Sequence, residues 1–424
     1  MPPVIDHPHR GKSRPGVPAY AGLRDGLRTL AIFHLADTSG PSKGLRPRLA
    51  ALAECGSLEV LAPGVGTLAS EYAVLGPVRA IDYEVLTVPR RPGEAVRALR
   101  RLGRDVRRFR REMRRARPDL VVVVTTVLPA ALIAARLERL PTVVYVGEIF
   151  AKGYVGGPAR VIGGRAIGAL TETLADRLVC CSHAVVEQFS ARGRGKAALI
   201  YPGIDAGHGE GDGAGFRAVH GLDDARPLVA VIGHLSPARG QDTAIRALPA
   251  LRACLPGARL VIAGAPPRPI DRAYAAELSD LAEQCGVADA VVFVGFVERI
   301  ADVYAAADVV VNPARFNEPF GRVGPEALIA GRPVVASAVG AIPEVLRHGR
   351  DALLVPPDDA EALAGAVIRL VEDDELRERI VREGGRRVRE RFGEAQGVAA
   401  FERVVAEALA ARRRPASRRP TAPS

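Results

Sequence analysis

Two glutamates eight positions apart, Glu318 and Glu326, flank a Phe-Gly turn in the last third of this 424-residue chain. Residues 307–313 before them (ADVVVNP) have the pattern of a buried parallel strand, and the residues from Pro325 onward are typical of a helix that ends at Gly331. The two carboxylates therefore bracket a strand-to-helix turn, where free backbone N–H groups and the positive end of a helix dipole meet. Such a turn suits phosphate oxygens and sugar hydroxyls, so the pattern predicts a nucleotide-sugar site.

Other segments surround this pair in a fixed order. They are GHLSPARG (233–240), LVIAG (260–264), VFVGF (292–296) and GRPVVAS (331–337), followed by Glu344, Gly349 and LLVPP (353–357). In these motifs the chain resembles the retaining glycosyltransferases of family 4, also called group 1, over roughly residues 227–395. The resemblance implies a GT-B fold, an α/β architecture in which two Rossmann-like doubly wound domains face each other across a cleft. The first half of the chain resembles the family in its alternation of elements more than in its motifs.

Length and composition set the frame for this expectation. A chain of 424 residues exceeds what one hydrophobic core usually supports, which predicts two domains. No run of about 18 uncharged apolar residues is present, so no transmembrane helix is expected. The five cysteines include the adjacent pair Cys180-Cys181 on an apolar strand, which does not suit a disulfide framework and predicts a reducing, cytoplasmic location. No Cys or His pair has the spacing of a structural zinc site.

Short Val, Leu and Ile runs alternate with helical stretches, which is typical of parallel sheets covered on both faces. In the first half, strands are expected at 29–36, 58–63, 83–88, 119–125, 142–146, 178–181 and 198–201. In the second half, they are expected at 228–232, 259–263, 291–294, 308–311, 333–336 and 352–355. The predicted division is a disordered tail (1–27), an acceptor-side domain (28–205), a Gly-rich linker too rich in glycine to pack (206–221), a nucleotide-sugar-binding domain (222–395), a helix that the resemblance places back on the first domain (396–411), and a basic disordered tail (412–424).

Transfer of a sugar from a nucleoside diphosphate needs compensation for the charge of the departing diphosphate. Without an Asp-x-Asp metal site, protein cations and backbone dipoles must supply it, so neither a metal nor another cofactor is expected. By the resemblance, the cations lie after the first strand of the second domain, where this chain has His234 and Arg239 in place of the usual Arg and Lys. Arg239 keeps the charge and offers a forked donor, whereas His234 is neutral near pH 7 unless a phosphate raises its pKa. The alternative is that His234 ends a strand and Arg239 is a surface residue.

The resemblance also assigns roles to the glutamates. Glu326 holds the ribose hydroxyls, and Glu318 contacts hydroxyls of the donor sugar; the alternative for both is charge complementing a helix dipole. The remaining predicted donor-binding residues are Gly40, Gly233, Gly295, Phe296, Phe320, Gly321 and Arg322. Where many relatives end the fifth strand with a histidine, this chain has Gly147 and Glu148. Glu148 is predicted to serve as a base or acceptor ligand, with a carboxylate satisfied by a nearby helix terminus as the alternative.

Arginine is concentrated in one segment. Residues 90–117 contain thirteen arginines against three acidic residues, a local charge of +10 in a chain of net charge +11. Apolar residues recur there at helical spacing, which predicts an amphipathic helix with a basic face. That face is either only solvated, or it meets anionic lipid at the inner face of the membrane or an anionic acceptor. Nucleic acid is disfavoured, because only Phe109 interleaves with the arginines to stack on bases.

These observations predict a retaining, metal-independent glycosyltransferase that moves a sugar from a nucleotide-sugar donor to a hydroxyl acceptor in a glycan, glycolipid or natural product. The predicted catalytic residues are Glu318, Arg239 and Glu148. By the resemblance the departing phosphate takes the acceptor proton, so no nucleophile from the protein is needed. A phosphorylase of the glycogen type would need a pyridoxal lysine, and none of the four lysines lies in the second domain. The alternative of another class is a non-catalytic sugar-nucleotide-binding partner with the same fold.

Overall fold

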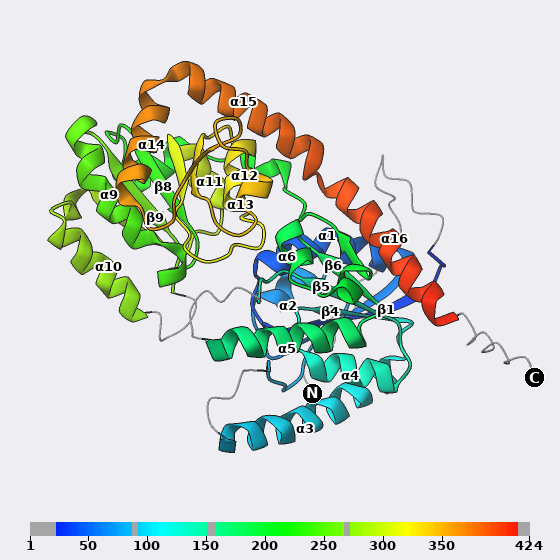
Figure 1. Ribbon diagram of the computed structural model, residues 1–424. Helices are drawn as coiled ribbons and strands as arrows, with labels where there is room; N and C mark the ends of the chain where they lie inside the picture. The colour runs from blue at the N-terminus through cyan, green and yellow to red at the C-terminus, as the bar shows by residue number, and fades with distance from the viewer. Residues whose placement is uncertain (1–22, 87–91, 151–157, 267–271, 414–424) are drawn as a thin grey trace, which may run out of the picture.

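Two parallel sheets form the framework of the computed structural model, which describes residues 23–86, 92–150, 158–266 and 272–413 (Figure 1). The first sheet has the order β3-β2-β1-β4-β5-β6-β7, and the second has the order β10-β9-β8-β11-β12-β13. The strands of the first are β1 (Leu27–Phe33), β2 (Gly56–Ala62), β3 (Val78–Ala80), β4 (Leu120–Val124), β5 (Thr142–Val146), β6 (Arg177–Cys180) and β7 (Ala197–Leu199). Those of the second are β8 (Leu228–Ile232), β9 (Arg259–Ala263), β10 (Val291–Gly295), β11 (Val309–Asn312), β12 (Val334–Ser337) and β13 (Leu353–Val355).

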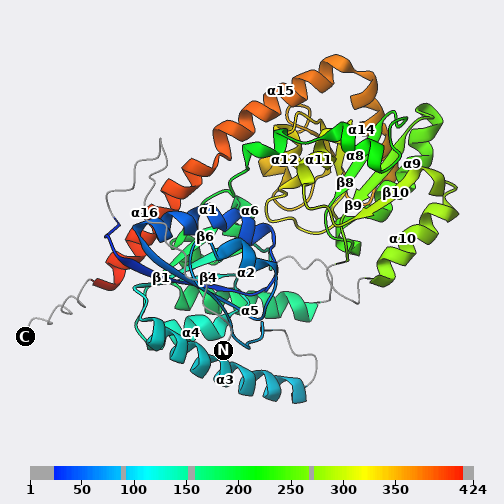
Figure 2. The same ribbon diagram turned by 180° about the vertical axis from the view of Figure 1, so that it is seen from behind.

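Helices cover both faces of each sheet (Figure 2). Around the first sheet they are α1 (Gly40–Cys55), α2 (Thr67–Tyr72), α3 (Pro92–Ala116), α4 (Pro129–Leu137), α5 (Pro158–Leu174), α6 (His183–Glu187) and α7 (Ala191–Arg194). Around the second they are η1 (Ala206–Gly209), α8 (Gly213–Val219), η2 (Pro237–Arg239), α9 (Gln241–Cys254), α10 (Arg272–Gln284), η4 (Ala288–Ala290), α11 (Ile300–Ala306), α12 (Val323–Ile329), α13 (Ile342–Val345), α14 (Ala360–Glu372) and α15 (Asp374–Arg391). Burial on both faces explains the uninterrupted apolar sequence of β4, LVVVV, in which every residue is buried. The predicted α/β class with two doubly wound domains is confirmed.

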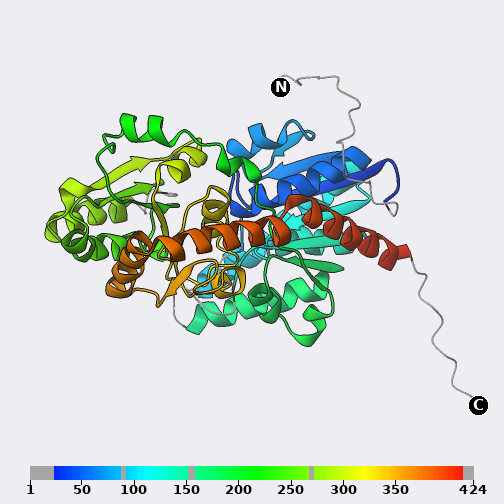
Figure 3. The same ribbon diagram turned by 90° about the horizontal axis from the view of Figure 1, so that it is seen from above.

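The last two helices run across both domains (Figure 3). Helix α15 packs against α12 of the second domain, and α16 (Glu394–Arg413) then lies against α1 and β6 of the first. Phe401 and Val405 of α16 are fully buried, and Arg412 pairs with Asp176 at 3.1 Å. The C-terminal helix is therefore a structural part of the first domain although it follows the second in sequence.

The strand predicted at 83–88 is wrong. The strand of this region is β3, a short segment at the edge of the sheet, and residues 81–86 form no strand. The reason is that Tyr83 fills a position in the core of the first domain instead of pairing in the sheet. Its hydroxyl lies within hydrogen-bond distance of the Phe33 and Leu61 carbonyls, and its ring packs against Phe109 at a centroid distance of 4.8 Å. A buried aromatic residue in a loop can give the same apolar sequence pattern as a short strand. The rest of the predicted strand, from residue 87, lies outside the described residues.

The segment predicted as an unpacked linker is instead folded. Within residues 206–221, η1 and α8 pack against α11, and Phe216 is buried. A Cβ atom on Gly211 would overlap the backbone of Ala301, and one on Gly213 would overlap the backbone of Ala305. The glycines are thus needed for close helix packing rather than for flexibility. The predicted tails, 1–27 and 412–424, fall mostly outside the described residues.

Candidate active site

The predicted donor-binding residues of the second domain follow the carboxyl ends of β8, β10 and β11. This edge is where ligands bind in open parallel sheets, next to the point at which the strand order reverses, here between β8 and β11. Gly240 closes the loop after β8 with φ +68°, and a Cβ there would overlap the carbonyl oxygen of Pro313 in the loop after β11. Because only glycine fits, the two loops press together and bring their side chains into contact.

Two of the predicted catalytic residues form an ion pair. Arg239 Nη1 donates to Glu318 Oε2 at 2.8 Å, and its guanidinium lies 4.9 Å from the centroid of the Phe316 ring. Glu318 is 8% exposed. Burial raises the pKa of the Glu318 carboxyl, and the Arg239 guanidinium opposes that rise. The Arg239 guanidinium is thus held at the carboxyl edge of the second sheet, with its orientation fixed by the Glu318 carboxylate and the Phe316 ring.

Glu326 lies in the first turn of α12 and is held from two sides. Its Oε1 accepts a hydrogen bond from Arg322 Nε at 2.9 Å, and its Oε2 accepts one from the Tyr304 hydroxyl at 2.8 Å. The His208 ring lies nearby, with Nε2 3.8 Å from Oε2. Tyr304, on α11, is fully buried, and burial raises the pKa of its hydroxyl further above the usual value, so it stays a donor. The carboxylate is therefore fixed in place while each oxygen keeps a free lone pair.

Tyr304 and His208 were missed by the sequence analysis. His208 lies in the segment interpreted as a linker, and Tyr304 lies in the short helix α11. A single tyrosine within the alanine-rich sequence IADVYAA was an available signal, because a buried tyrosine usually needs a partner for its hydroxyl.

Arg322 joins the two domains. Besides holding Glu326, its Nη1 donates to the Gly203 carbonyl at 3.0 Å. A Cβ on Gly40, at the start of α1, would lie 3.8 Å from Arg322 Cδ, so this predicted first-domain residue does border the second-domain site. The side chain of Arg322 thus contacts both the Glu326 carboxylate and the main chain of the first domain.

The other predicted donor-binding residues differ in their surroundings. Gly233 and Gly295 both have positive φ at strand ends, and Phe296 is 80% exposed at the rim. The His234 carbonyl accepts a hydrogen bond from Gln241 Nε2 at 2.9 Å. Gly321 takes φ +78° in the turn, whereas the Phe320 side chain is buried at the domain interface, 5.4 Å from the Phe392 ring centroid and 6.1 Å from that of Tyr201.

Glu148 lies at the end of β5 in the first domain, at the edge that faces the second. It accepts hydrogen bonds from the Thr125 hydroxyl (2.8 Å), the Thr126 N–H (2.6 Å) and hydroxyl (2.7 Å), and the Gly147 N–H (3.0 Å). The carboxylate is satisfied by two loop threonines and the main chain, not by a helix terminus. Thr125 is held at φ +113°, which is strained for a β-branched residue.

His34 is a first-domain polar residue that the sequence analysis did not single out. Its Nδ1 lies 3.1 Å from the Val124 carbonyl, which makes Nδ1 the protonated nitrogen of the neutral ring. Burial lowers the pKa of the ring, and the charge of Glu148 opposes this. The ends of β1, β4 and β5 thus form a second polar cluster, on the first-domain side of the site.

Among the described residues, no group of three or more His, Cys, Asp or Glu side chains is placed to hold a metal ion. Nor does any helix in this part of the chain have the length and apolar character needed to cross a membrane.

Both halves of the chain match models of known protein families. Residues 214–387 match the model of the glycosyl transferases group 1, and residues 49–208 match that of Glycosyltransferase Family 4. The D-inositol 3-phosphate glycosyltransferase of Mycobacteroides abscessus is 39% identical over 177 residues, which is 41% of this chain and 38% of that protein. The GDP-mannose-dependent alpha-(1-6)-phosphatidylinositol monomannoside mannosyltransferase of Mycobacterium tuberculosis is 37% identical over 190 residues, 42% of this chain and 48% of that protein. The matched part thus spans less than half the length of these two relatives.

Solved structures show the same fold. The Anabaena protein HepE in complex with UDP and glucose superposes with a TM-score of 0.74 at 23% identity, covering 91% of this chain and 99% of that one. WaaG, a glycosyltransferase involved in lipopolysaccharide biosynthesis, superposes with a TM-score of 0.65 at 16% identity, covering 88% and 99%. The GT-B arrangement expected from the sequence is confirmed.

Proposed function

Since the chain belongs to the group 1, family 4 glycosyltransferases, we propose that it transfers a sugar from a nucleotide-sugar donor to a hydroxyl acceptor. We further propose that it does so with retention of configuration and without a metal ion. The observation that carries the proposal is that the Arg239–Glu318 ion pair and the anchored Glu326 both follow the carboxyl ends of strands in the second sheet. A cation for a diphosphate and a carboxylate for a diol are the two groups that such a donor requires.

Glu326 would hold the ribose. An ionised carboxylate has about four acceptor positions, and Arg322 and Tyr304 occupy one on each oxygen. One position per oxygen is left, which matches the two neighbouring hydroxyls of a ribose. One solved neighbour is in complex with UDP and one relative is GDP-mannose-dependent, so a test of donor binding must include both bases.

Arg239 would compensate the charge of the departing diphosphate. Its fork reaches Glu318 through Nη1, and its remaining N–H groups are suited to bidentate contact with phosphate oxygens. The bond from the anomeric carbon to the diphosphate oxygen breaks, and the acceptor oxygen bonds to the same face of the sugar. The acceptor proton passes to the departing phosphate, so the protein supplies position and charge rather than a nucleophile.

The acceptor would bind against the first domain, beside Glu148. Four hydrogen bonds hold this carboxylate at the edge that faces the second domain, which suits a ligand for an acceptor hydroxyl.

Contact with an anionic membrane is a further part of the proposal, and we assign it to four arginines of α3. Many arginines of α3 are paired, such as Arg101 with Glu84, Arg108 with Asp82, and Arg114 with Glu138. Among the described residues, no ion pair engages Arg97, Arg100, Arg107 or Arg111, which are exposed. Val96 and Leu99 lie on the same stretch and are 51% and 68% exposed. Apolar groups beside free arginines fit the interface of an anionic bilayer.

A thermal-shift screen of UDP, GDP, ADP and TDP tests donor binding. A nucleotide at about 100 times its dissociation constant stabilises a protein by roughly 2.7 kcal/mol. Glu326→Ala should abolish the shift, and Glu361→Ala, a change of the same kind at an exposed position on α14, should keep it. With a nucleotide identified, its sugar conjugates are assayed for transfer with and without EDTA. Nucleotide binding without transfer to any acceptor would favour the non-catalytic alternative, and loss of transfer in EDTA would contradict metal independence.

Vesicle co-sedimentation tests the membrane contact. Replacing Arg97, Arg100, Arg107 and Arg111 by Gln should abolish binding to phosphatidylglycerol vesicles. Replacing four paired arginines, Arg101, Arg108, Arg110 and Arg114, changes the net charge equally and should leave most of it. Equal loss in both variants, or binding to neutral phosphatidylcholine, would contradict a defined lipid-binding face.

A further inference from the structure

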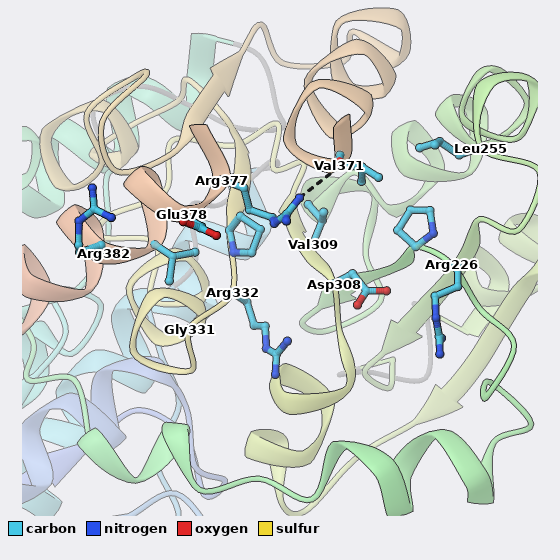
Figure 4. A pocket seen from close by; sticks show the side chains of 13 residues that line it. Arg226, Leu255, Asp308, Val309, Gly331, Arg332, Val371, Arg377, Glu378 and Arg382 are labelled. Atoms are coloured by element: carbon cyan, nitrogen blue, oxygen red, sulfur yellow. Dashed lines mark hydrogen bonds between the residues drawn. The ribbon is translucent and has the colours of Figure 1, made fainter. Parts of the chain in front are cut away.

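A cavity lies at the edge of the second sheet that is opposite the candidate donor site (Figure 4). Its lining includes Pro227, Asp308 and Arg332, which precede β8, β11 and β12, whereas the donor-site residues follow β8, β10 and β11. The strands are four or five residues long, so at about 3.3 Å per residue the two edges are roughly 15 Å apart. The cavity has a volume of about 820 Å³, within the usual range of small-molecule sites of about 300–1,000 Å³.

The cavity has apolar walls. Its lining includes Leu255, which follows α9, Val309 at the start of β11, and Val371 and Val381 from α14 and α15. A chain of a few methylene groups would displace water from these side chains, which is favourable for each CH₂ group buried.

The charged side chains that line the cavity differ in whether they have hydrogen-bond and ion-pair partners within the protein. Arg377 donates to the carbonyls of Leu370 and Val371, at 3.2 and 3.1 Å, and pairs with Asp374 at 2.5 Å. Asp308, the acid on the sheet side, accepts from Arg217 Nη2 at 3.0 Å and from the Leu228 N–H at 2.7 Å. These side chains are held in place by the fold.

Arg332 is different. Its Nε is buried and makes no hydrogen bond within the described chain, and it has no carboxylate within ion-pair distance there. Burial lowers the pKa of its guanidinium. The charge of Asp308 opposes this decrease, and the charge of Arg217 adds to it. Figure 4 shows Arg332 between Glu378 and Arg382 of α15 on one side and Asp308 and Arg226 on the other. A guanidinium that burial disfavours and that has no carboxylate partner would be stabilised by an anion bound beside it.

We propose that this cavity is a second ligand site, for a small amphipathic anion in which a phosphate or carboxylate group is attached to a short apolar chain. The anionic group pairs with Arg332, and the exposed Arg382 and Arg226 add charge at the rim. The apolar chain lies against the valines of α14 and α15. The four arginines exceed the two acids of the lining, so the net charge favours an anion although Asp308 and Glu378 are present.

Octyl phosphate, below its micellar concentration, is the probe for isothermal titration calorimetry with the full chain. We expect saturable binding that is weakened at least about tenfold by Arg332→Met, which keeps the length of the side chain and removes its donors. Arg382→Gln at the exposed rim should weaken it several-fold. Arg369→Gln, an exposed arginine of α14 outside the cavity, should leave it unchanged. Octanol and inorganic phosphate, which carry one half of the proposed ligand each, should bind at least about tenfold more weakly.

Several results would overturn the proposal: no saturable binding of octyl phosphate, octanol binding as tightly as octyl phosphate, or unchanged binding in Arg332→Met. Weakening by Arg239→Ala instead would place the probe at the donor site. If Arg332→Met does not fold, as judged by circular dichroism, Arg382→Gln decides, and unchanged binding in that variant counts against the site. None of these results depends on whether the donor assignment is correct.

Discussion

Tyr304→Phe should weaken nucleotide binding without any contact between residue 304 and the nucleotide. The substitution keeps the fully buried ring and removes only the hydroxyl that donates to Glu326 Oε2 at 2.8 Å. A hydrogen bond to a charged group contributes about 1.5–3 kcal/mol, and Glu326 would keep Arg322 as its remaining donor within hydrogen-bond distance. The bond from Tyr304 exists in the free and the bound protein alike, so its loss weakens binding through the ordering of Glu326, about 0.5–1.5 kcal/mol per side chain. We therefore expect the dissociation constant of the nucleotide to rise by several-fold to about tenfold, since 1.4 kcal/mol is a factor of ten.

The chain offers a matched control in the same domain. The Tyr274 hydroxyl also donates to a buried carboxylate at 2.8 Å, that of Asp242, which keeps Arg246 and Arg315 as donors. Tyr274→Phe should lower the melting temperature by a few degrees and leave the dissociation constant within about twofold of wild type. Calorimetric titration of the nucleotide found in the screen measures both variants. If Tyr304→Phe lowers the melting temperature as Tyr274→Phe does and also leaves nucleotide affinity unchanged, the donor role of Glu326 is refuted.

Three further predictions concern positions around the site. Because burial raises the folded-state pKa of Glu318 above its ordinary value of 4.5, its ionisation costs stability as pH rises through that range. Glu318→Gln should therefore gain stability relative to wild type between about pH 4 and pH 7 while transfer is lost; a pH-independent difference in calorimetry would contradict this. Gly240→Ala should cost several kcal/mol in denaturant unfolding, because its Cβ meets Pro313, against about 1–2 kcal/mol for Gly286→Ala, which has φ +67° and open space; equal costs would show that the loop contact is unimportant. Glu148→Gln should raise the KM for the acceptor several-fold and leave nucleotide affinity unaltered, and the reverse pattern would remove Glu148 from the acceptor side.

The sheets were largely predictable, because strands buried on both faces are written as unbroken Val, Leu and Ile runs. Strands β8 and β9 were predicted with their bounds, 228–232 and 259–263. Strand β3 was not, since VRA at a sheet edge is short and lacks that signal. The segment 206–221 was misinterpreted because glycine allows both flexibility and close packing, and only the position of α11 decides between them.

The candidate site was predictable where its residues share one motif. Glu318 and Arg239 lie in the segments that follow two buried strands, and Glu326 lies in the first turn of the helix after one of them, so the pattern located them. Tyr304 and His34 act through single hydrogen bonds to residues far away in sequence, and no local spacing marks such a contact. The pairing of Arg239 with Glu318 likewise arises between two loops 79 positions apart.

The way in which the chain passes between the domains restricts how they can move. One passage lies near residue 204 and the other near residue 392, and the two are tied together by a hydrogen bond from the Ile204 N–H to the Phe392 carbonyl at 2.9 Å. A Cβ on Gly203 would lie 2.9 Å from Glu394 Cα, so the passages also touch side by side. Because the two connecting segments lie side by side, any rotation of one domain relative to the other would pivot about them, and sliding of the domains would break their contact. Opening and closing would then follow one arc, and the bond from Arg322 to the Gly203 carbonyl, which lies beside the pivot, would move least.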